Sequence, residues 1–260
     1  MYNVNNLFLS SAGYNISRSL RFNDNDSAYL DRTPSSSGNR RTFTFSCWCK
    51  RSSFGSSFAT LFASSGNSNF FKFQFRDDDR FEINTADGGS DTTQLITTAR
   101  FRDVSAWYHI VIAFDTTQGD ASNRVKMYVN NRQITSFDNT TRPSQNQQHA
   151  VNDNVEHQIG NQVGNTRYFD GYMAEINHVD GQQLEPSSFG EYHPVTGAWV
   201  PRSYSGSHGT NGFYLNFSDN SNNTAATLGK DSSGSNNFTP NNFSVSAGQG
   251  NDSLEDTPTN

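Results

Sequence analysis

The stretch Trp107–Ile134 reads WYHIVIAFDTTQGDASNRVKMYVNNRQI and decides the fold class. It contains two apolar runs rich in residues that favour β-strands, Trp107–Asp115 and Arg124–Ile134, with the polar loop Thr116–Asn123 between them. Two such runs joined by a short polar loop are typical of an antiparallel pair of strands. We therefore predict that this pair forms the centre of a β-sandwich.

The two runs differ in how their apolar side chains are distributed. The second has the period of two that is typical of a half-buried strand, with apolar residues at Val125, Met127 and Val129. The first is apolar on both faces, so we expect it to be covered on both sides. Asn130-Asn131 then predicts a tight turn, because Asn tolerates the left-handed backbone conformation that such turns require.

The composition supports an all-β fold with an aromatic core. Only 32% of the 260 residues are hydrophobic, but 21 Phe, 10 Tyr and 3 Trp concentrate the apolar area in large rings. Each buried ring removes roughly 150–250 Å² from water, so a sandwich core can be built from few residues. Ser, Thr, Asn and Gly are abundant, which favours strands joined by turns.

Charge and hydropathy exclude two classes of partner. The net charge is −6, and no cluster of Lys and Arg supplies the basic face that nucleic-acid binding requires. The charged run Arg76–Arg80 lies between two predicted strands and indicates a hairpin turn. No stretch of about 18 apolar residues exists, so we expect no membrane insertion. The start MYNVNNLFLSSAGYN has neither a basic segment nor a long apolar centre, so we expect no signal peptide.

The two cysteines, Cys47 and Cys49, are expected to be free thiols. They are two residues apart in an extended run and therefore point the same way, roughly 6.5–7 Å apart, which is too far for an unstrained disulfide. Free thiols suit assembly in a reducing cytoplasm.

Further strands follow from alternation and turn residues along the chain. In Arg41–Lys50, Phe43 and Phe45 share a face with both cysteines, and Trp48 lies on the other, so either face is a candidate for the interior. We predict a long polar loop over Thr135–Val155, and Gly171 indicates a bulge or a close backbone approach. A single helical turn is expected at the start of Leu184–Tyr192. The other predicted strands are Ser19–Phe22, Ala28–Leu30, Phe58–Ala63, Phe71–Phe75, Arg80–Asn84, Thr93–Phe101, His157–Gly160, Arg167–Val179 and Phe213–Phe217.

About a dozen short strands with almost no helix indicate an antiparallel two-sheet β-sandwich or jelly roll. Several motifs in order resemble a concanavalin A-like, laminin G-type jelly roll. These are RF-x₅-AYL from Arg21, FTFSCWCK from Phe43, WYHIVIAFDTT from Trp107, VKMYVNNRQI from Val125 and FDGYMAEINHVDGQQLEPSSF from Phe169. The resemblance covers residues 14–192 and is specific only in combination.

A closer resemblance is to structural proteins of tailed bacteriophages, particularly marine ones. It is carried by SLRFNDNDSAYLDRTPSSSGNRRTFTFSCWCKRS and LGKDSSGSNNFTPNNFSVSAGQGNDSLEDTPTN. The resemblance implies a tail-fibre, adhesin or head-decorating protein that is located on the virion and made in the host cytoplasm.

The chain divides into an arm at residues 1–13, a jelly roll at 14–192 and a C-terminal extension at 193–260. Residues 212–217 resemble the segment that opens a laminin G-type domain, although they lie near the end of this chain. We expect that they fold back as a permuted strand of the same sandwich. The alternative is that they begin a second domain.

The search for catalytic residues finds none. Glycoside hydrolases need two carboxylates about 5–5.5 or 6.5–9.5 Å apart, and the best candidates, Asp170 and Glu175, differ by five positions and so face opposite ways unless Gly171 bulges. The histidines have no zinc-binding spacing, and no nucleophile elbow or phosphate-binding loop is present. We therefore predict that the protein is not an enzyme and has no organic cofactor.

Two kinds of binding residue remain as candidates. The laminin G resemblance implies a calcium site at a loop rim, and Asp115 and Asp170 have matching positions, with solvated loop acids as the alternative. Tyr168, Trp199 and Tyr204 are candidates for stacking on carbohydrate, with burial in the core as the alternative.

These observations lead to one functional hypothesis and two alternatives. We expect a non-enzymatic virion module that attaches to other virion proteins, forms a trimeric or higher homo-oligomer and presents a lectin-like face to a host-surface glycan. The first alternative is a decoration or anchoring protein without a ligand. The second is a polysaccharide-degrading enzyme.

Overall fold

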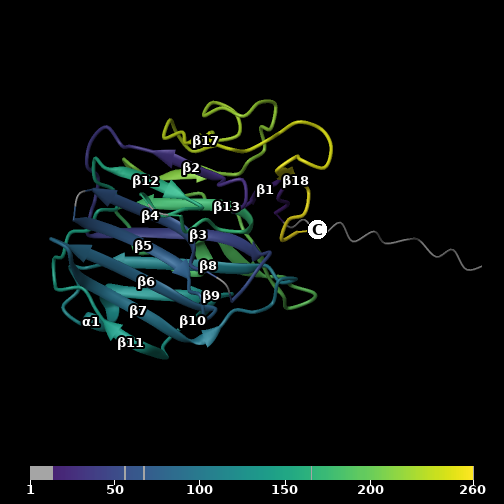
Figure 1. Ribbon diagram of the computed structural model, residues 1–260. Helices are drawn as coiled ribbons and strands as arrows, with labels where there is room; N and C mark the ends of the chain where they lie inside the picture. The colour runs from purple at the N-terminus through teal and green to yellow at the C-terminus, as the bar shows by residue number, and fades with distance from the viewer. Residues whose placement is uncertain (1–13, 56, 67, 165, 260) are drawn as a thin grey trace, which may run out of the picture.

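The computed structural model describes residues 14–55, 57–66, 68–164 and 166–259, so the predicted arm at 1–13 lies outside the described residues. Within this part of the chain the fold is two antiparallel sheets, which overlie one another in Figure 1. The antiparallel two-sheet sandwich predicted from the sequence is confirmed. No helix among these residues is both long enough and apolar enough to cross a bilayer.

Sheet 1 contains the pair of strands predicted from the opening stretch. Its order is β10 (Arg132–Gln133), β9 (Val125–Val129), β8 (Tyr108–Asp115), β3 (Thr42–Arg51), β13 (Gly171–Asp180), β1 (Ser19–Phe22) and β18 (Ser253–Leu254), and β16 (Phe213–Leu215) also pairs with β13. The predicted turn at Asn130-Asn131 has positive φ at both residues and separates β9 from β10.

Sheet 2 packs against sheet 1. Its order is β11 (Phe137–Thr141), β7 (Ser90–Arg100), β6 (Arg80–Asp87), β5 (Asn69–Phe75), β4 (Ala59–Gly66), β12 (Glu156–Ile159), β2 (Tyr29–Arg32) and β17 (Thr239–Asn241). The smaller elements are the hairpin β14 (Gly190–Tyr192) and β15 (Trp199–Pro201), the helix α1 (Ala121–Arg124) and the 3₁₀ turn η1 (Pro186–Ser188). The helical turn predicted near residue 184 is therefore confirmed.

The interior between the sheets is filled with phenylalanine rings. Phe43 stacks on Phe114 with ring centroids 4.8 Å apart, and Phe45 meets Phe73 edge to face at 4.7 Å. Cys47 and Cys49 are buried in the same core as free thiols, as predicted. The face of β3 that bears Phe43 is thus the one that points to the core.

The outer face of sheet 1 is also covered. Val111, Val179 and Phe189 form a second apolar cluster, which confirms that β8 is buried on both sides. Trp48 is only 4% exposed and packs with Ile16 and Ala174 in a third cluster. The segment after β13 supplies Phe189 to this covering layer.

Two local predictions are wrong. Residues 135–155 are not one loop, because β11 lies within them and pairs with β7. The loop after β8 includes the short helix α1, whose first turn is capped by the Asp120 side chain accepting from Ser122 N at 2.8 Å.

The bulge in β13 lies at Glu175 rather than at Gly171. The register with β3 shifts between Ala174 and Asn177, and Glu175 has φ +51°. At Gly171 a Cβ atom would lie 2.2 Å from the backbone oxygen of Lys50, so glycine there permits a close backbone approach. The close backbone approach predicted at Gly171 is therefore confirmed, whereas the bulge predicted there as the alternative lies at Glu175.

The C-terminal residues add strands to both sheets. β16 pairs with β13, β17 with β2, and β18 with β1, which places the yellow end of the chain along the edges of both sheets in Figure 1. Phe213, Leu215 and Phe238 are buried in the main core cluster. In the described structure, residues 212–217 thus lie beside β13 as part of this sandwich.

Candidate functional site

A continuous row of side chains, most of them buried or nearly so, crosses the side of sheet 2 that faces away from sheet 1. Residues paired in adjacent strands project to the same face, so the register identifies them. The row consists of Asp31, Gln158, Ala63, Lys72, Asn84 and Gln94. A second, parallel row consists of Thr60, Gln74 and Glu82. We call the surface formed by these two rows the polar face.

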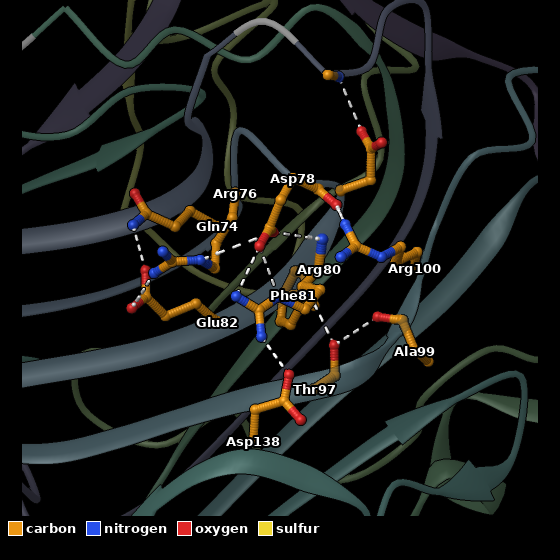
Figure 2. Close-up of polar contacts among 12 residues, drawn as sticks. Gln74, Arg76, Asp78, Arg80, Phe81, Glu82, Thr97, Ala99, Arg100 and Asp138 are labelled. Carbon is orange, nitrogen blue, oxygen red and sulfur yellow. Dashed lines mark hydrogen bonds and ion pairs between the residues drawn. The ribbon is translucent and has the colours of Figure 1, made fainter.

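Hydrogen bonds to Glu82 connect the second row with Arg76 and with Gln94 of the first row. Gln74 Nε2 donates to Glu82 Oε2 at 2.7 Å, while Arg76 Nη1 and Gln94 Nε2 donate to Glu82 Oε1 at 3.0 and 3.1 Å. Figure 2 shows Gln74 and Arg76 meeting on this carboxylate. Glu82 is only 3% exposed, and its oxygens are committed to these donors.

The predicted hairpin turn at Arg76–Arg80 borders this network. Arg80 forms an ion pair with Asp78 at 2.6 Å and a second one with Asp138 (Figure 2). These contacts connect the β5–β6 turn with β11. The charged run therefore has a structural role in the turn, as the sequence indicated.

Three cations lie on or beside the polar face. Lys72 is 7% exposed, lies 4.8 Å from the centroid of the Phe70 ring and donates to Gln162 Oε1 at 3.2 Å. The guanidinium groups of Arg76 and Arg167 lie 5.2 and 4.4 Å from the centroid of one ring, that of Phe58. Burial, reinforced by Arg167, lowers the pKa of Lys72 to about 8.

A polar hollow of about 500 Å³ lies at one end of the polar face. It is lined by Tyr29, Gln158, Asn161, Gly164, Thr166 and Tyr168. The rings of Tyr29 and Tyr168 lie 6.3 Å apart with an angle of 46° between their planes. The Gln158 Oε1 atom is buried and has no hydrogen-bond partner among the described residues. Tyr168, one of the predicted stacking residues, thus lies where aromatic and amide groups converge.

Tyr204, a second predicted stacking residue, lines a different hollow of about 460 Å³. The His208 ring lies between Tyr204 and Tyr214, with centroid distances of 5.1 and 6.2 Å. Asp231 also lines this hollow, and its carboxylate accepts hydrogen bonds from Tyr214 N at 2.9 Å and Asn236 N at 3.0 Å. The sequence reasoning named Tyr204 but not the residues that surround it.

Trp199, the third predicted stacking residue, is committed to packing. Its indole stacks on His109 at 5.9 Å, and its Nε1 donates to His109 Nδ1 at 3.0 Å. Because Nδ1 accepts, the ring proton lies on Nε2, 2.9 Å from Ser46 Oγ. Complete burial lowers the pKa of His109 to about 3. A histidine in this state donates to the serine and does not activate it as a nucleophile.

The structure does not bring the two predicted calcium ligands together. Asp115 pairs with Thr42 at one end of β3, and Asp170 precedes Gly171, which pairs with Arg51 at the other end. Ten residues of β3 separate them by roughly 30 Å. No group of three or more His, Cys, Asp or Glu side chains within the described ranges has the geometry of a metal site.

The carboxylate of Asp115 also has other partners, since it accepts from Thr117 Oγ1 and Gln118 Nε2 at 2.6 Å each. These residues do not fit a shared calcium ion.

The pair Asp170 and Glu175 also lacks the geometry of a hydrolase. They lie roughly 15 Å apart along β13, beyond the span that either hydrolytic mechanism uses. Glu175 is 5% exposed and accepts hydrogen bonds at 2.8 Å from the hydroxyl groups of Tyr14 and Tyr214. Burial raises its pKa to about 7.

The sequence contains a signal for the polar face in the polar residues that alternate with the core rings. In Phe71–Phe75 the residues between the core rings are Lys72 and Gln74, and in Arg80–Asn84 they are Glu82 and Asn84. Alternation predicts that these polar side chains share the outer face. It does not predict which strands lie side by side, so the continuous rows were not predicted.

Comparison with known proteins agrees with this architecture. A family model described as the concanavalin A-like lectin/glucanases superfamily, laminin G type, matches residues 23–183. No curated protein sequence matches the chain.

Solved structures similar to the chain include a heptameric SAP-like pentraxin from Limulus polyphemus, with 13% identity, TM-score 0.47 and coverage of 72% of this chain and 92% of the pentraxin. Domains LG4-5 of the mouse laminin α1 chain have 14% identity, TM-score 0.44 and coverage of 75% of this chain and 48% of theirs. Domain 4 of an arabinanase from Geobacillus stearothermophilus has 15% identity, TM-score 0.41 and coverage of 57% and 65%. With the family match spanning most of the sandwich, this chain belongs to the concanavalin A-like lectin/glucanases superfamily, in its laminin G-type branch.

Proposed function

We propose that the protein is a non-enzymatic carbohydrate-binding module of a bacteriophage virion, part of a tail fibre or capsid appendage. It attaches to other virion proteins in a trimeric or higher assembly and binds a host-surface glycan on the polar face. The observation that carries the proposal is the row of amide and charged side chains that leads into the hollow between Tyr29 and Tyr168. Binding sites combine apolar ring surface with a few fixed polar groups, and this hollow offers both.

The state of the carboxylates supports binding rather than hydrolysis. Glu82, the buried acid of the polar face, is saturated with three donors. Glu175 lies on sheet 1, where the hydroxyl groups of Tyr14 and Tyr214 cover it. Hydrolysis of a glycoside needs one free acid and one free base or nucleophile across the same bond. The phage assignment is supported by the resemblance of the sequence around residues 19–52 and 228–260 to tailed-phage structural proteins.

The proposal is tested by glycan-array and host-cell binding of the full chain and two matched variants. Tyr168→Ala removes a ring from the hollow, whereas Tyr192→Ala removes a ring that is 58% exposed on the β14–β15 hairpin. We expect binding to fall at least tenfold for Tyr168→Ala and to be unchanged for Tyr192→Ala. Absence of glycan binding by the folded wild-type protein, or equal binding by Tyr168→Ala, would overturn the proposal.

A second candidate function is anchoring or decoration without a ligand. It is favoured by the exposed apolar side chains of the β14–β15 hairpin, since Tyr192 and Val195 are 58% and 74% exposed. Exposed apolar groups that lie together suit contacts between proteins. Under this alternative, Tyr192→Ala reduces incorporation into particles, and the isolated wild-type chain does not adsorb to host cells.

A further inference from the structure

We propose that the glycan recognised by the polar face carries carboxylate groups, and that Lys72 and Arg167 bind one of them. This inference rests on the proposed function and specifies its ligand class. The starting point is the partners of the two cations, which are neutral. Lys72 Nζ donates to the amide oxygen of Gln162 at 3.2 Å, and Arg167 Nη1 donates to that of Gln74 at 3.4 Å.

Neither cation has a carboxylate within ion-pair distance in the part of the chain that the structure describes, whereas Arg76 has Glu82 at 3.0 Å. A buried lysine without a countercharge is costly, and contact with the Phe70 ring compensates only part of that cost. The direction of the Lys72 pKa agrees with this, because burial and the charge of Arg167 lower it more than Glu82 and Asp91 raise it. Lys72 and Arg167 therefore lack a directly paired carboxylate, although the protein as a whole has a net charge of −6.

The position of the cations relative to the hollow gives the ligand an orientation. Lys72 lies two strands from Gln158, or about 10 Å at the usual strand spacing, with the small Ala63 between them. Arg167 directly precedes Tyr168 in the chain, so one oligosaccharide can stack in the hollow and reach both cations. Asp31 lies at the opposite end of the row, beside Gln158. An acidic group is therefore repelled from the hollow and attracted to the Lys72 end.

The inference is tested with oligogalacturonate, with its methyl ester and with the carboxyl-reduced oligosaccharide, which share one backbone. Binding of the full chain is measured by isothermal calorimetry, with dextran sulfate as a probe for general polyanion binding. We expect at least tenfold tighter binding of the carboxylate form than of either neutral form. Lys72→Gln and Arg167→Gln each reduce this preference at least fivefold.

The control variant is Lys230→Gln, which removes the same charge from an exposed lysine outside the polar face and leaves the preference unchanged. Equal binding of the three oligosaccharides, or binding of neutral array glycans only, overturns this inference and leaves the proposed function intact. If Lys230→Gln reduces the preference for the carboxylate form as much as Lys72→Gln does, the preference reflects general charge attraction, and this result also overturns the inference. Absence of binding to any glycan, on the array as well, is instead the failure of the proposed function. If a variant does not fold, the comparison of the three oligosaccharides on the wild-type chain decides.

Discussion

The hydroxyl group of Tyr14 donates a hydrogen bond to Oε2 of Glu175 at 2.8 Å, although 161 positions separate the two residues in the chain. Tyr214 donates to the same carboxyl group, and the two tyrosine oxygens lie 2.6 Å apart. Glu175 is held in the left-handed conformation of the β13 bulge. One buried carboxyl group therefore joins the start of the described chain, the central strand β13 and the C-terminal extension.

This carboxyl group makes stability depend on pH. Its pKa is about 7 in the folded protein against 4.5 for an ordinary glutamate, so between these values the folded state holds a proton that the unfolded state releases. The contribution of Glu175 to the free energy of unfolding therefore falls as pH rises through this window, by a total on the order of 3 kcal/mol above pH 7. We expect Glu175→Gln to lack this contribution, so that its stability relative to the wild type is greater at pH 8 than at pH 5, as measured by urea unfolding at both pH values.

The matched control is Glu191→Gln, which changes an exposed glutamate of β14. Its unfolding curve should follow that of the wild type at both pH values. Identical pH dependence of Glu175→Gln and wild type would show that Glu175 is already ionised at low pH in the folded state.

The buried histidines act in the opposite direction to Glu175, because they make the protein less stable as pH falls below 6.5. Burial lowers the pKa of His109 and His149 to about 3 and that of His157 to about 4, against 6.5 when exposed. Below pH 6.5 the unfolded state gains protons that the folded state excludes, so stability falls as pH falls. Each histidine contributes about 1.4 kcal/mol per pH unit until its folded pKa is reached.

The acid effect is measured most simply in the Glu175→Gln background, where the opposing carboxyl group is absent. We expect the midpoint of guanidinium unfolding to drop steeply between pH 6.5 and 5. A midpoint that is constant over this range would mean that these rings are reached by water and protonated in the folded state.

Removal of one core ring should cost far more than removal of a surface ring. Phe62 is fully buried and lies 5.1 Å from Phe45 and 5.5 Å from Phe73, whereas Phe54 is 51% exposed. Phe62→Ala leaves a cavity and should lower the free energy of unfolding by about 3–5 kcal/mol. Phe54→Ala should change it by about 0.5 kcal/mol or less. Similar costs for the two variants, by denaturant unfolding, would contradict the assigned interior.

The C-terminal extension should be inseparable from the jelly roll. The ring centroids of Phe213 and Phe238 lie 4.6 Å apart inside the common core, and β16 pairs with β13. We expect a chain truncated after residue 204 to be unfolded by circular dichroism, because it loses several core rings at once. Limited proteolysis that releases residues 205–260 and leaves a core of unchanged stability would show instead that the extension is a separate unit.

The sequence by itself determined most of the strands and, where the alternation is clear, their inward faces. A period of two identifies the buried side of a strand from a handful of residues, as Phe71, Phe73 and Phe75 do in β5. The same reasoning correctly placed the free cysteines and the charged turn at Arg76–Arg80. It did not find β11, because FDNTT is a polar edge strand with no alternation to mark it.

Only the tertiary structure decided which residues meet. The rows of the polar face depend on the order of strands in sheet 2, and the Tyr14–Glu175–Tyr214 contact depends on a bulge and on two distant segments. The same holds for Asp115 and Asp170, which looked equivalent along the chain and lie at opposite ends of β3. The physical reason is that alternation records only the burial of each strand's two faces, whereas neighbours across a sheet are chosen by pairing between strands far apart in the chain.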